Sequence, residues 1–430
     1  MKEVFKKVVV SILTAEASLV IKRRKPVIIA ITGSVGKTST KDAIFSAIKS
    51  SVRARKSEKS FNSDIGVPLT VLGLPNGWNN PLVWLRNIVD GFLTVLFPGD
   101  YPKILVLETG IDRPGDMSKL TRWLKPNIVV LTRLPDVPSH VEYFGSKEAV
   151  VEEKMKLVLA MKPNGVLVYN HDDEIIKSKL PEVIQKQVGF SRYLESDFTA
   201  RNDKITYRDD VPCGTQFEIS TSGKLHKIKL KDTVGSQHSY ACAAAMAVAT
   251  QLEIPEDTAA KSLSDLSTPK GRMRIIKGLK GTTVIDDTYN SSPVAVSHAI
   301  ETLKEINYAK RKIAVLGDML ELGKFSSIEH KKVGEQVVGV FDVLITVGVR
   351  ARQIAEGALS AGMSEENILQ YEEAERAGRE LQNLIKVGDV ILVKASQGVR
   401  SEKIVEEIMN DPERADELLV RQDKTWKNIA

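Results

Sequence analysis

The sequence predicts an α/β protein, because short apolar runs and stretches with helical periodicity alternate along the chain in two successive series. The apolar runs end in small or acidic residues, which is typical of βαβ units with a mainly parallel sheet and ligands at the strand carboxyl ends. In the first series they fall at residues 27–31, 104–107, 128–131 and 166–169. In the second series they fall at residues 283–285, 313–316, 343–347 and 390–393.

The length of 430 residues is sufficient for two or three domains with their own hydrophobic cores. Residues 266–271 separate the two series and contain Pro and Gly, as a hinge does. We therefore expect an N-terminal helix over residues 1–26 and a central domain over residues 27–268. The polar, β-rich residues 197–231 are expected at the edge of this domain, and residues 269–430 are expected to form a Rossmann-like C-terminal α/β domain.

The basic charge of the chain is concentrated at its N-terminal end. Of the formal net charge of +6, residues 1–25 carry +5, from seven Lys and Arg side chains against two Glu. A nucleic-acid-binding protein would spread basic charge over a folded face, so this class is disfavoured. Cys213 and Cys242 suggest neither a disulfide framework nor a zinc site, which favours a reducing compartment such as the cytoplasm.

The apolar run at residues 8–21 is too short to span a bilayer, which takes about 20 residues. It is followed by four basic residues and has no small-residue cleavage site, so it does not resemble a signal peptide. We expect a basic amphipathic helix over residues 1–25. This helix is expected either to pack on the central domain or to lie on a membrane surface.

A glycine loop follows the first strand and precedes a helical stretch at residues 38–50. Its glycines allow backbone N–H groups to approach phosphate oxygens, Lys37 supplies charge for the β- and γ-phosphates, and Thr38 offers a hydroxyl to Mg²⁺. Ile31 replaces the first glycine of the general phosphate-loop (P-loop) pattern, and a chance glycine turn is the alternative. The central domain is thus predicted to be a P-loop domain that binds ATP. The nucleotide-binding residues are expected to be Gly33, Ser34, Val35, Gly36, Lys37, Thr38 and Ser39.

Ordered motifs run through most of the chain. They lie at residues 32–40, 62–70, 108–110, 140–146, 271–272, 286–290 and 316–323. Over residues 27–410 the chain resembles the Mur ligases. The resemblance implies an ATP-dependent amide ligase of peptidoglycan precursor synthesis, acting as a monomer. Such an enzyme activates a muramoyl peptide carboxylate as an acyl phosphate, joins it to D-alanyl-D-alanine (D-Ala-D-Ala), and releases ADP and phosphate.

The resemblance also implies roles for single residues. Glu108 and Thr38 are expected to bind one Mg²⁺, and His140 the second. Lys154 matches a lysine that family members carry as a carbamate, which is anionic and able to bind Mg²⁺. Arg272 is expected to meet the phosphates when the C-terminal domain closes, since a guanidinium binds phosphate oxygens in pairs. The catalytic set is then Lys37, Glu108, His140, Lys154 and Arg272.

The second series of strands is expected to contribute further residues by the same resemblance. Asp287 and Asn290 should contact the nucleotide, and residues 394–400 should line the acceptor site. The chain departs from the family at Ser239 and Cys242, where asparagines contact adenine, and Ser292 likewise replaces an asparagine. The family's N-terminal UDP-binding domain is expected to be missing, because only 26 residues precede the first strand.

Two alternatives remain open. One is a Mur-like ligase of another pathway, such as folate polyglutamylation or synthesis of a polymer other than murein. The motifs at residues 289–290 and 317–319 argue against it. The other is a non-catalytic nucleotide-binding scaffold, and the presence of all five expected catalytic residues argues against that.

Overall fold

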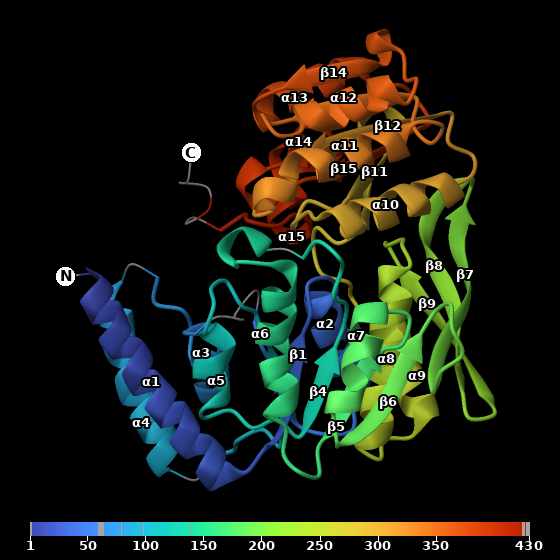
Figure 1. Cartoon of the computed structure of the whole chain (residues 1–430). Coiled ribbons are helices and arrows are strands. Elements are labelled where there is room, and N and C mark those ends of the chain that lie inside the picture. Colours follow the sequence, from blue (N-terminus) through green and yellow to red (C-terminus); the bar gives the residue numbers. More distant parts are fainter. Residues whose placement is uncertain are drawn as a thin grey trace.

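The computed structural model describes residues 2–58, 64–78, 80–97, 99–138, 140–423 and 426. The chain forms two mainly parallel sheets with helices on both faces, which confirms the predicted fold class (Figure 1). The predicted motif residues at 62 and 63 lie outside the described part of the chain.

The first sheet has nine strands in the order β2-β3-β1-β4-β5-β6-β7-β8-β9. The strands from β2 to β7 pair in parallel, and β7, β8 and β9 form an antiparallel meander. This meander is the β-rich edge predicted at residues 197–231. The strands are β1 Val27–Thr32, β2 Ala54–Lys56, β3 Ile104–Glu108, β4 Ile128–Leu131, β5 Val166–Asn170, β6 Lys186–Ser191, β7 Phe198–Arg208, β8 Val211–Thr221 and β9 Lys224–Lys231.

Residues of β1 alternate between the two faces of this sheet, as the pleat of a strand requires. Ile29 and Ile31 pack in one core with α2 (Lys37–Ile48), α8 (Gln237–Gln251) and α9 (Glu256–Ser264). Ile28 and Ala30 pack in the core of the opposite face. The helices on the opposite side are α1 Lys2–Arg24, α3 Gly66–Leu72, α4 Pro81–Leu96, α5 Asp116–Thr121, α6 Lys147–Leu159 and α7 Glu174–Lys179.

The second sheet has the order β10-β11-β15-β12-β13-β14, and only β10 runs antiparallel to its neighbour. Its strands are β10 Arg274–Lys277, β11 Thr283–Asp286, β12 Arg311–Gly317, β13 Val343–Val347, β14 Ile368–Tyr371 and β15 Asp389–Lys394. Its helices are α10 Pro293–Glu305, α11 Ser326–Val337, α12 Arg352–Ser360, α13 Ala374–Leu384, α14 Glu402–Ile408 and α15 Ala415–Leu418.

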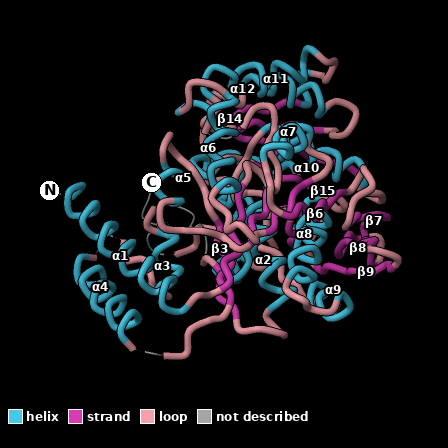
Figure 2. Tube along the Cα trace, turned by 60° about the horizontal axis from the view of Figure 1, so that its bottom comes forward, coloured by secondary structure: helices cyan, strands magenta, loops and turns pink. Residues whose placement is uncertain are grey.

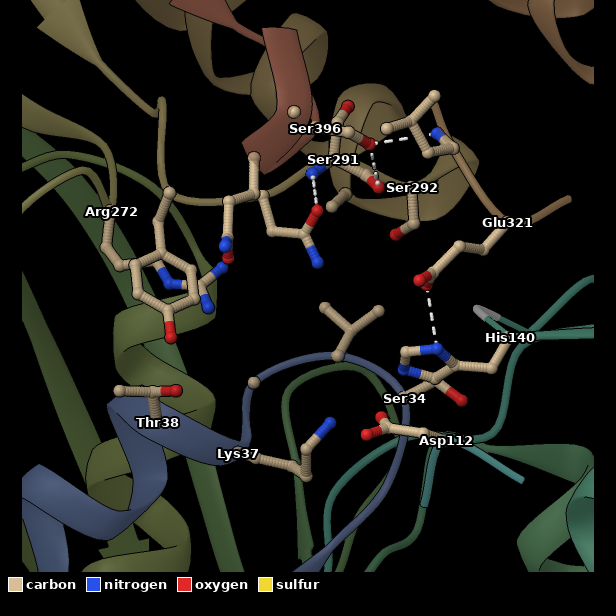
Figure 3. Close-up of a pocket in the computed structure, with 18 of the residues that line it drawn as sticks. Ser34, Lys37, Thr38, Asp112, His140, Arg272, Ser291, Ser292, Glu321 and Ser396 are labelled. Atoms are coloured by element: carbon tan, nitrogen blue, oxygen red, sulfur yellow. Dashed lines mark hydrogen bonds and ion pairs between the residues drawn. The ribbon is translucent and has the colours of Figure 1, made fainter. Parts of the chain in front are cut away.

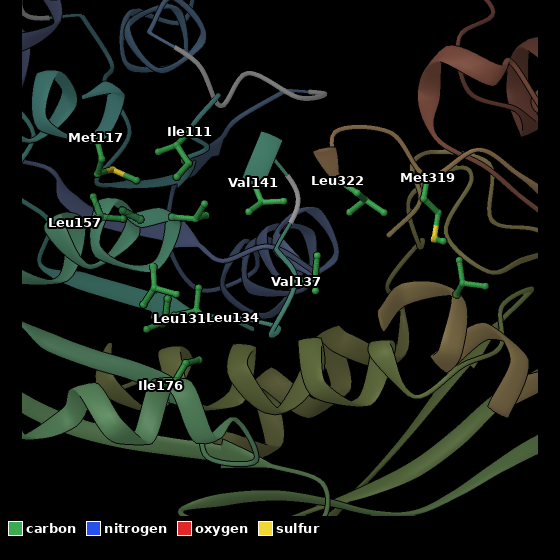
Figure 4. Packing of buried hydrophobic residues seen from close by; sticks show 14 of the residues in the cluster. Ile111, Met117, Leu131, Leu134, Val137, Val141, Leu157, Ile176, Met319 and Leu322 are labelled. Atoms are coloured by element: carbon green, nitrogen blue, oxygen red, sulfur yellow. The ribbon is translucent and has the colours of Figure 1, made fainter. Parts of the chain in front are cut away.

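One hydrophobic cluster continues from the first half of the chain into the second. Val137 and Val141 come from the segment after β4, and Met319 and Leu322 come from the segment after β12 (Figure 4). All four side chains are buried. This contact fixes the loops at the carboxyl ends of both sheets next to each other.

Helix α1 packs on the body of the protein, which is one of the two arrangements expected from the sequence. Val9, Leu13, Ala17 and Val20 are buried on its inner side, against α3 and α4. Helices α1 and α4 lie side by side at one edge of the molecule (Figures 1 and 2). Among the described helices, none combines the length and the hydropathy that crossing a membrane would need.

Candidate active site

The glycine loop lies between the end of β1 and the start of α2. Gly33 has a φ of +140°, and a Cβ at this residue would lie 2.1 Å from the Thr132 hydroxyl. Gly36 also has a positive φ, of +87°. The Thr132 hydroxyl donates to the Val35 carbonyl at 2.7 Å, so the end of β4 holds the loop in place. Glycine is therefore required where the loop turns back on the neighbouring strand.

Two lysines meet at this loop. Lys37 Nζ donates to the Gly33 carbonyl at 2.9 Å, and Lys154 Nζ, from α6, donates to the same oxygen at 3.1 Å. Burial lowers the pKa of Lys37, and Glu108 partly counteracts this. Burial, reinforced by the charge of Lys37, lowers the pKa of Lys154 well below its ordinary value. The loop is thus an electropositive site suited to phosphate groups.

Glu108 ends β3 beside the start of α2, and its side chain is almost completely buried. The Thr38 hydroxyl donates to Glu108 Oε1 at 3.2 Å. Glu108 Oε2 has no hydrogen-bond partner among the described residues and lies 3.9 Å from Lys41 Nζ. A hydroxyl beside a carboxylate with an unsatisfied oxygen is a donor set that suits Mg²⁺. Thr38 and Glu108 therefore fit the ion that the sequence predicts.

His140 lies in the left-handed region of φ/ψ space, with a φ of +69°. Its Nδ1 atom lies 2.7 Å from Oε2 of Glu321, which comes from the second half of the chain. The ion pair lowers the pKa of Glu321. Histidines that bind metals commonly hold a carboxylate on their other ring nitrogen. His140 is oriented in this way, with Nε2 left for a ligand.

Arg272 projects from the segment between the two sheets. Its guanidinium lies 4.2 Å from the ring centroid of Tyr289, and its charge lowers the pKa of Lys37. Gly271 is needed beside it because a Cβ there would lie 2.9 Å from the Tyr289 amide nitrogen. The Arg272 side chain is therefore held on an aromatic face, within electrostatic range of the phosphate loop.

Asp287 is paired inside the second half of the chain. Its Oδ2 atom accepts a 2.6 Å bond from the buried Lys394, and its Oδ1 atom accepts one from the Met273 amide. Lys394 also donates to the Asn290 carbonyl at 2.9 Å. The pair therefore fixes the loop that presents Asn290, and Asp287 itself does not line the cavity described next.

These elements enclose a cavity of about 640 Å³. Its lower wall in Figure 3 carries Ser34, Lys37 and Thr38, and its upper wall carries Ser291, Ser292 and Ser396 from the second half. Ten of the predicted catalytic, nucleotide-binding and metal-binding residues line it: Ser34, Val35, Gly36, Lys37, Thr38, Glu108, His140, Lys154, Arg272 and Asn290. Ser396, Gln397, Gly398 and Arg400, from the segment predicted to line the acceptor site, line it as well. Gly33 and Ser39 do not line the cavity. The lysines, His140 and Arg272 are thus brought together from distant parts of the chain.

Sequence reasoning missed several residues of this cavity. Asp112 and Glu321 place carboxylates at the His140 side, and Tyr289 supports Arg272. Glu321 lies within a motif that had been recognised, but nothing local identified His140 as its partner. Trp426 lines the cavity from the C-terminal end of the chain and carries no motif at all.

The residues at the expected adenine positions are buried in α8. His238 bonds to the Thr233 hydroxyl at 2.8 Å, and burial lowers its pKa to about 4. Ser239 and Cys242 are fully buried and do not line the cavity. Ser292, which replaces another asparagine, does line it. Contacts to the base therefore have to come from residues other than Ser239 and Cys242.

Two protein-family descriptions match the chain. The Mur ligase middle domain matches residues 31–249, and the Mur ligase glutamate ligase domain matches residues 271–397. Together they contain every predicted catalytic, nucleotide-binding and metal-binding residue.

Individual proteins and solved structures are also similar to the chain. The UDP-N-acetylmuramoyl-tripeptide–D-alanyl-D-alanine ligase of Bacillus subtilis is 29% identical, and the match covers 90% of this chain and 76% of the relative. A MurF ligase from Thermotoga maritima, solved with ADP, superposes with a TM-score of 0.75 at 26% identity, over 94% of this chain and 84% of that chain. A folylpolyglutamate synthase of Mycobacterium tuberculosis shares only the fold, with a TM-score of 0.63 at 16% identity, over 92% and 94% of the two chains.

Proposed function

The chain belongs to the Mur ligase family, and we propose that it joins D-Ala-D-Ala to a muramoyl peptide in peptidoglycan precursor synthesis. The reaction consumes ATP and yields the amide, ADP and phosphate. A substrate carboxylate attacks the γ-phosphate, and the amine of the dipeptide then displaces phosphate from the acyl phosphate.

The arrangement of the cavity carries this proposal. A phosphate loop with two lysines forms one wall, and loops after β11, β12 and β15 form the opposite wall. A ligase of this type needs a nucleotide on one side of the reacting carboxylate and an amine on the other. Lys37 and Arg272 stabilise charge on the transferred phosphoryl group, which is the main task of a protein in phosphoryl transfer.

We further propose that Thr38 and Glu108 would hold one Mg²⁺, and that His140 Nε2 would take part in a second site. Mg²⁺ supplies charge neutralisation on the phosphates when bound. Glu321 positions His140 by its contact with Nδ1.

Lys154 is proposed to carry a carbamate. Carbon dioxide reacts with a neutral amine, and the depressed pKa of Lys154 favours that form. The reaction forms an N–C bond and releases a proton. It also replaces a buried cation next to Lys37 with an anion, which removes the repulsion between the two side chains and supplies oxygen ligands for Mg²⁺.

The proposal also covers the compartment, the oligomeric state and the partners of the enzyme. We place it in the cytoplasm as a monomer, with small-molecule substrates, no nucleic-acid partner and a contact between residues 1–25 and a membrane surface. The domain boundaries after residues 26 and 268 also belong to it.

The test is a ligation assay with ATP, Mg²⁺, UDP-muramoyl tripeptide and D-Ala-D-Ala, followed by mass detection of the pentapeptide product. We expect formation of product with equimolar ADP. ADP release without product, or product in the absence of ATP, would contradict the proposal. Replacing D-Ala-D-Ala by L-glutamate and the muramoyl peptide by a folate tests the alternative of folate polyglutamylation. That alternative is supported only by the fold shared with the folylpolyglutamate synthase.

A further inference from the structure

The outward surface of α1 and α4 is apolar to an unusual degree. The exposed side chains are Val8, Ile12 and Leu19 of α1 and Leu82, Leu85, Val89, Phe92, Leu93 and Leu96 of α4, followed by Phe97. Their exposed fractions run from 36% at Ile12 to 74% at Leu82. We call these ten residues the outer face. Single exposed apolar residues are ordinary, but a row of this length on two adjacent helices indicates a binding surface.

The spacing in α4 places the exposed residues on one stripe. Residues 82, 85, 89, 92, 93 and 96 follow the helical repeat, while Trp84, Asn87 and Gly91 on the opposite side are buried. Only Arg86 and Asp90 are charged in this helix, and they form an ion pair at 3.3 Å. Helix α4 is therefore held against the body of the protein on one side and exposes an apolar stripe on the other.

The helix pair is firmly held, so its outer face does not turn inward. A Cβ at Gly91 would lie 2.1 Å from Glu16 Oε2, which shows how closely the two helices approach. Arg23 Nη1 donates to the Val95 carbonyl at 3.1 Å, and Arg24 Nη2 donates to the Thr94 carbonyl at 3.3 Å. These bonds satisfy carbonyls in the last turn of α4, which have no hydrogen-bond partners within the helix.

Basic side chains border the outer face at both ends of α1. Lys6 and Lys7 are exposed near its start, and Lys22, Arg23 and Lys25 are exposed at and just beyond its end. Among the acidic residues of the two helices whose side chains the structure describes, Glu16 is buried on the inner side and Asp90 pairs with Arg86. An apolar stripe between clusters of cations is complementary to a lipid layer with anionic headgroups.

We propose that the outer face docks on the surface of an anionic phospholipid bilayer, with its apolar side chains among the headgroups and upper acyl chains. A second copy of the chain fits less well. Because both ends of α1 are basic, either orientation of a symmetric pair would bring cations against cations. None of the described helices is long and apolar enough to cross a bilayer, so the proposed attachment is peripheral.

Residues of α1 and of the active site line one common cavity. A second cavity of about 530 Å³ is lined by Lys6, Val10 and Thr14 of α1 on one side. Asp112 and Glu321, which also line the active-site cavity, line this second cavity too. A substrate that enters along α1 would therefore pass the headgroup region on its way to the phosphate loop.

The test is cosedimentation of the full chain with vesicles of phosphatidylglycerol and phosphatidylcholine in equal parts, at low and high salt. We expect binding that is lost with pure phosphatidylcholine. The triple variant Leu85→Ser, Phe92→Ser, Leu96→Ser should weaken the partition constant at least tenfold. Lys6→Gln with Lys7→Gln should weaken it by about fivefold per residue, and only on anionic vesicles.

The matched control is Ile184→Ser, Leu225→Ser, Val387→Ser, three apolar residues elsewhere in the chain that are at least as exposed. It should bind as the wild type does, and circular dichroism should show unchanged folding in both triple variants. Absence of binding by the wild type, or equal loss in the control, overturns the proposal. The proposal is also overturned if the wild type is a dimer in light scattering and binds no vesicles, while the α4 triple variant alone is a monomer. The assay contains no ligation step, so it is independent of the proposed activity.

Discussion

Lys37 and Lys154 donate to one and the same oxygen, the carbonyl of Gly33, at 2.9 and 3.1 Å. The two ammonium groups are 117 positions apart in the chain, and burial lowers the pKa of both. For Lys154, no carboxylate among the described residues lies within ion-pair distance. Two ammonium groups at one carbonyl repel each other unless an anion such as a nucleotide phosphate joins them, or unless one of the amines is neutral, which the lowered pKa of Lys154 favours.

Replacement of Lys37 by alanine should remove the charge that faces the transferred phosphoryl group. We expect kcat/KM to fall by about 10²–10³ or more, as for loss of one preorganised electrostatic group. Lys119→Ala, an exposed lysine on α5, serves as the control and should stay near wild type. Retention of more than half of the wild-type turnover in the Lys37 variant would refute its assigned role.

Substitution of Gly33 by alanine should close the loop to phosphates. The new methyl group would collide with the Thr132 hydroxyl, and the φ of +140° disfavours any side chain. We expect affinity for ADP, measured by calorimetry, to fall by at least 10²-fold. Gly145→Ala is the matched control, since a Cβ there meets nothing within 4 Å and its φ is not positive. Equal affinities of the two variants would contradict the geometry of the loop.

The sequence predicted best what depends on neighbouring residues. The strand–glycine–helix order of residues 27–48 is a local pattern, and the structure has it as predicted. Strand β2 was missed because its three residues, Ala54–Lys56, contain no apolar run, and it forms only by pairing with β3. Asp287 was assigned to the nucleotide, but its pairing with Lys394 joins positions 107 apart, and no local pattern reveals such a contact.

Arg272 should not tolerate replacement by lysine. Its planar guanidinium stacks on Tyr289 and can bind two phosphate oxygens at once, whereas an ammonium does neither as well. We expect Arg272→Lys and Arg272→Ala both to lower kcat by at least tenfold, with KM for the dipeptide changed less. Arg274→Lys, two residues along on β10, should be close to wild type. Full activity of Arg272→Lys would show that only its charge matters.

Glu16 should make the stability of the protein depend on pH. Burial between α1 and α4 raises its pKa from 4.5 to about 7. Between these values the folded state keeps the proton that the unfolded chain releases, so the free energy of unfolding should fall as pH rises from 4.5 to 7. The change is at most about 3 kcal/mol, and less where water reaches the carboxyl group.

Urea titrations at several pH values measure this dependence. The slope between pH 4.5 and 7 should be reduced in Glu16→Gln, which cannot titrate, and kept in Glu335→Gln, an exposed position on α11. Identical slopes in wild type and Glu16→Gln would exclude Glu16 as the titrating group.

The carbamate on Lys154 is the last expectation to be tested. Because the pKa of Lys154 is well below its ordinary value, its amine is neutral at a pH where an exposed lysine is still charged. Carbamate formation at Lys154 should therefore proceed at a lower pH than at an exposed lysine. In ¹³C-labelled bicarbonate, a carbamate signal should appear in the NMR spectrum of the wild type and be missing from Lys154→Ala. Lys156→Ala is the control, since Lys156 lies on the same helix but is partly exposed and pairs with Glu153. Short carboxylic acids should restore activity to Lys154→Ala, because they can place an anion where the carbamate would lie. A wild type without the signal, together with a Lys154→Ala variant that no carboxylic acid rescues, would leave Lys154 as a cation at the phosphate loop.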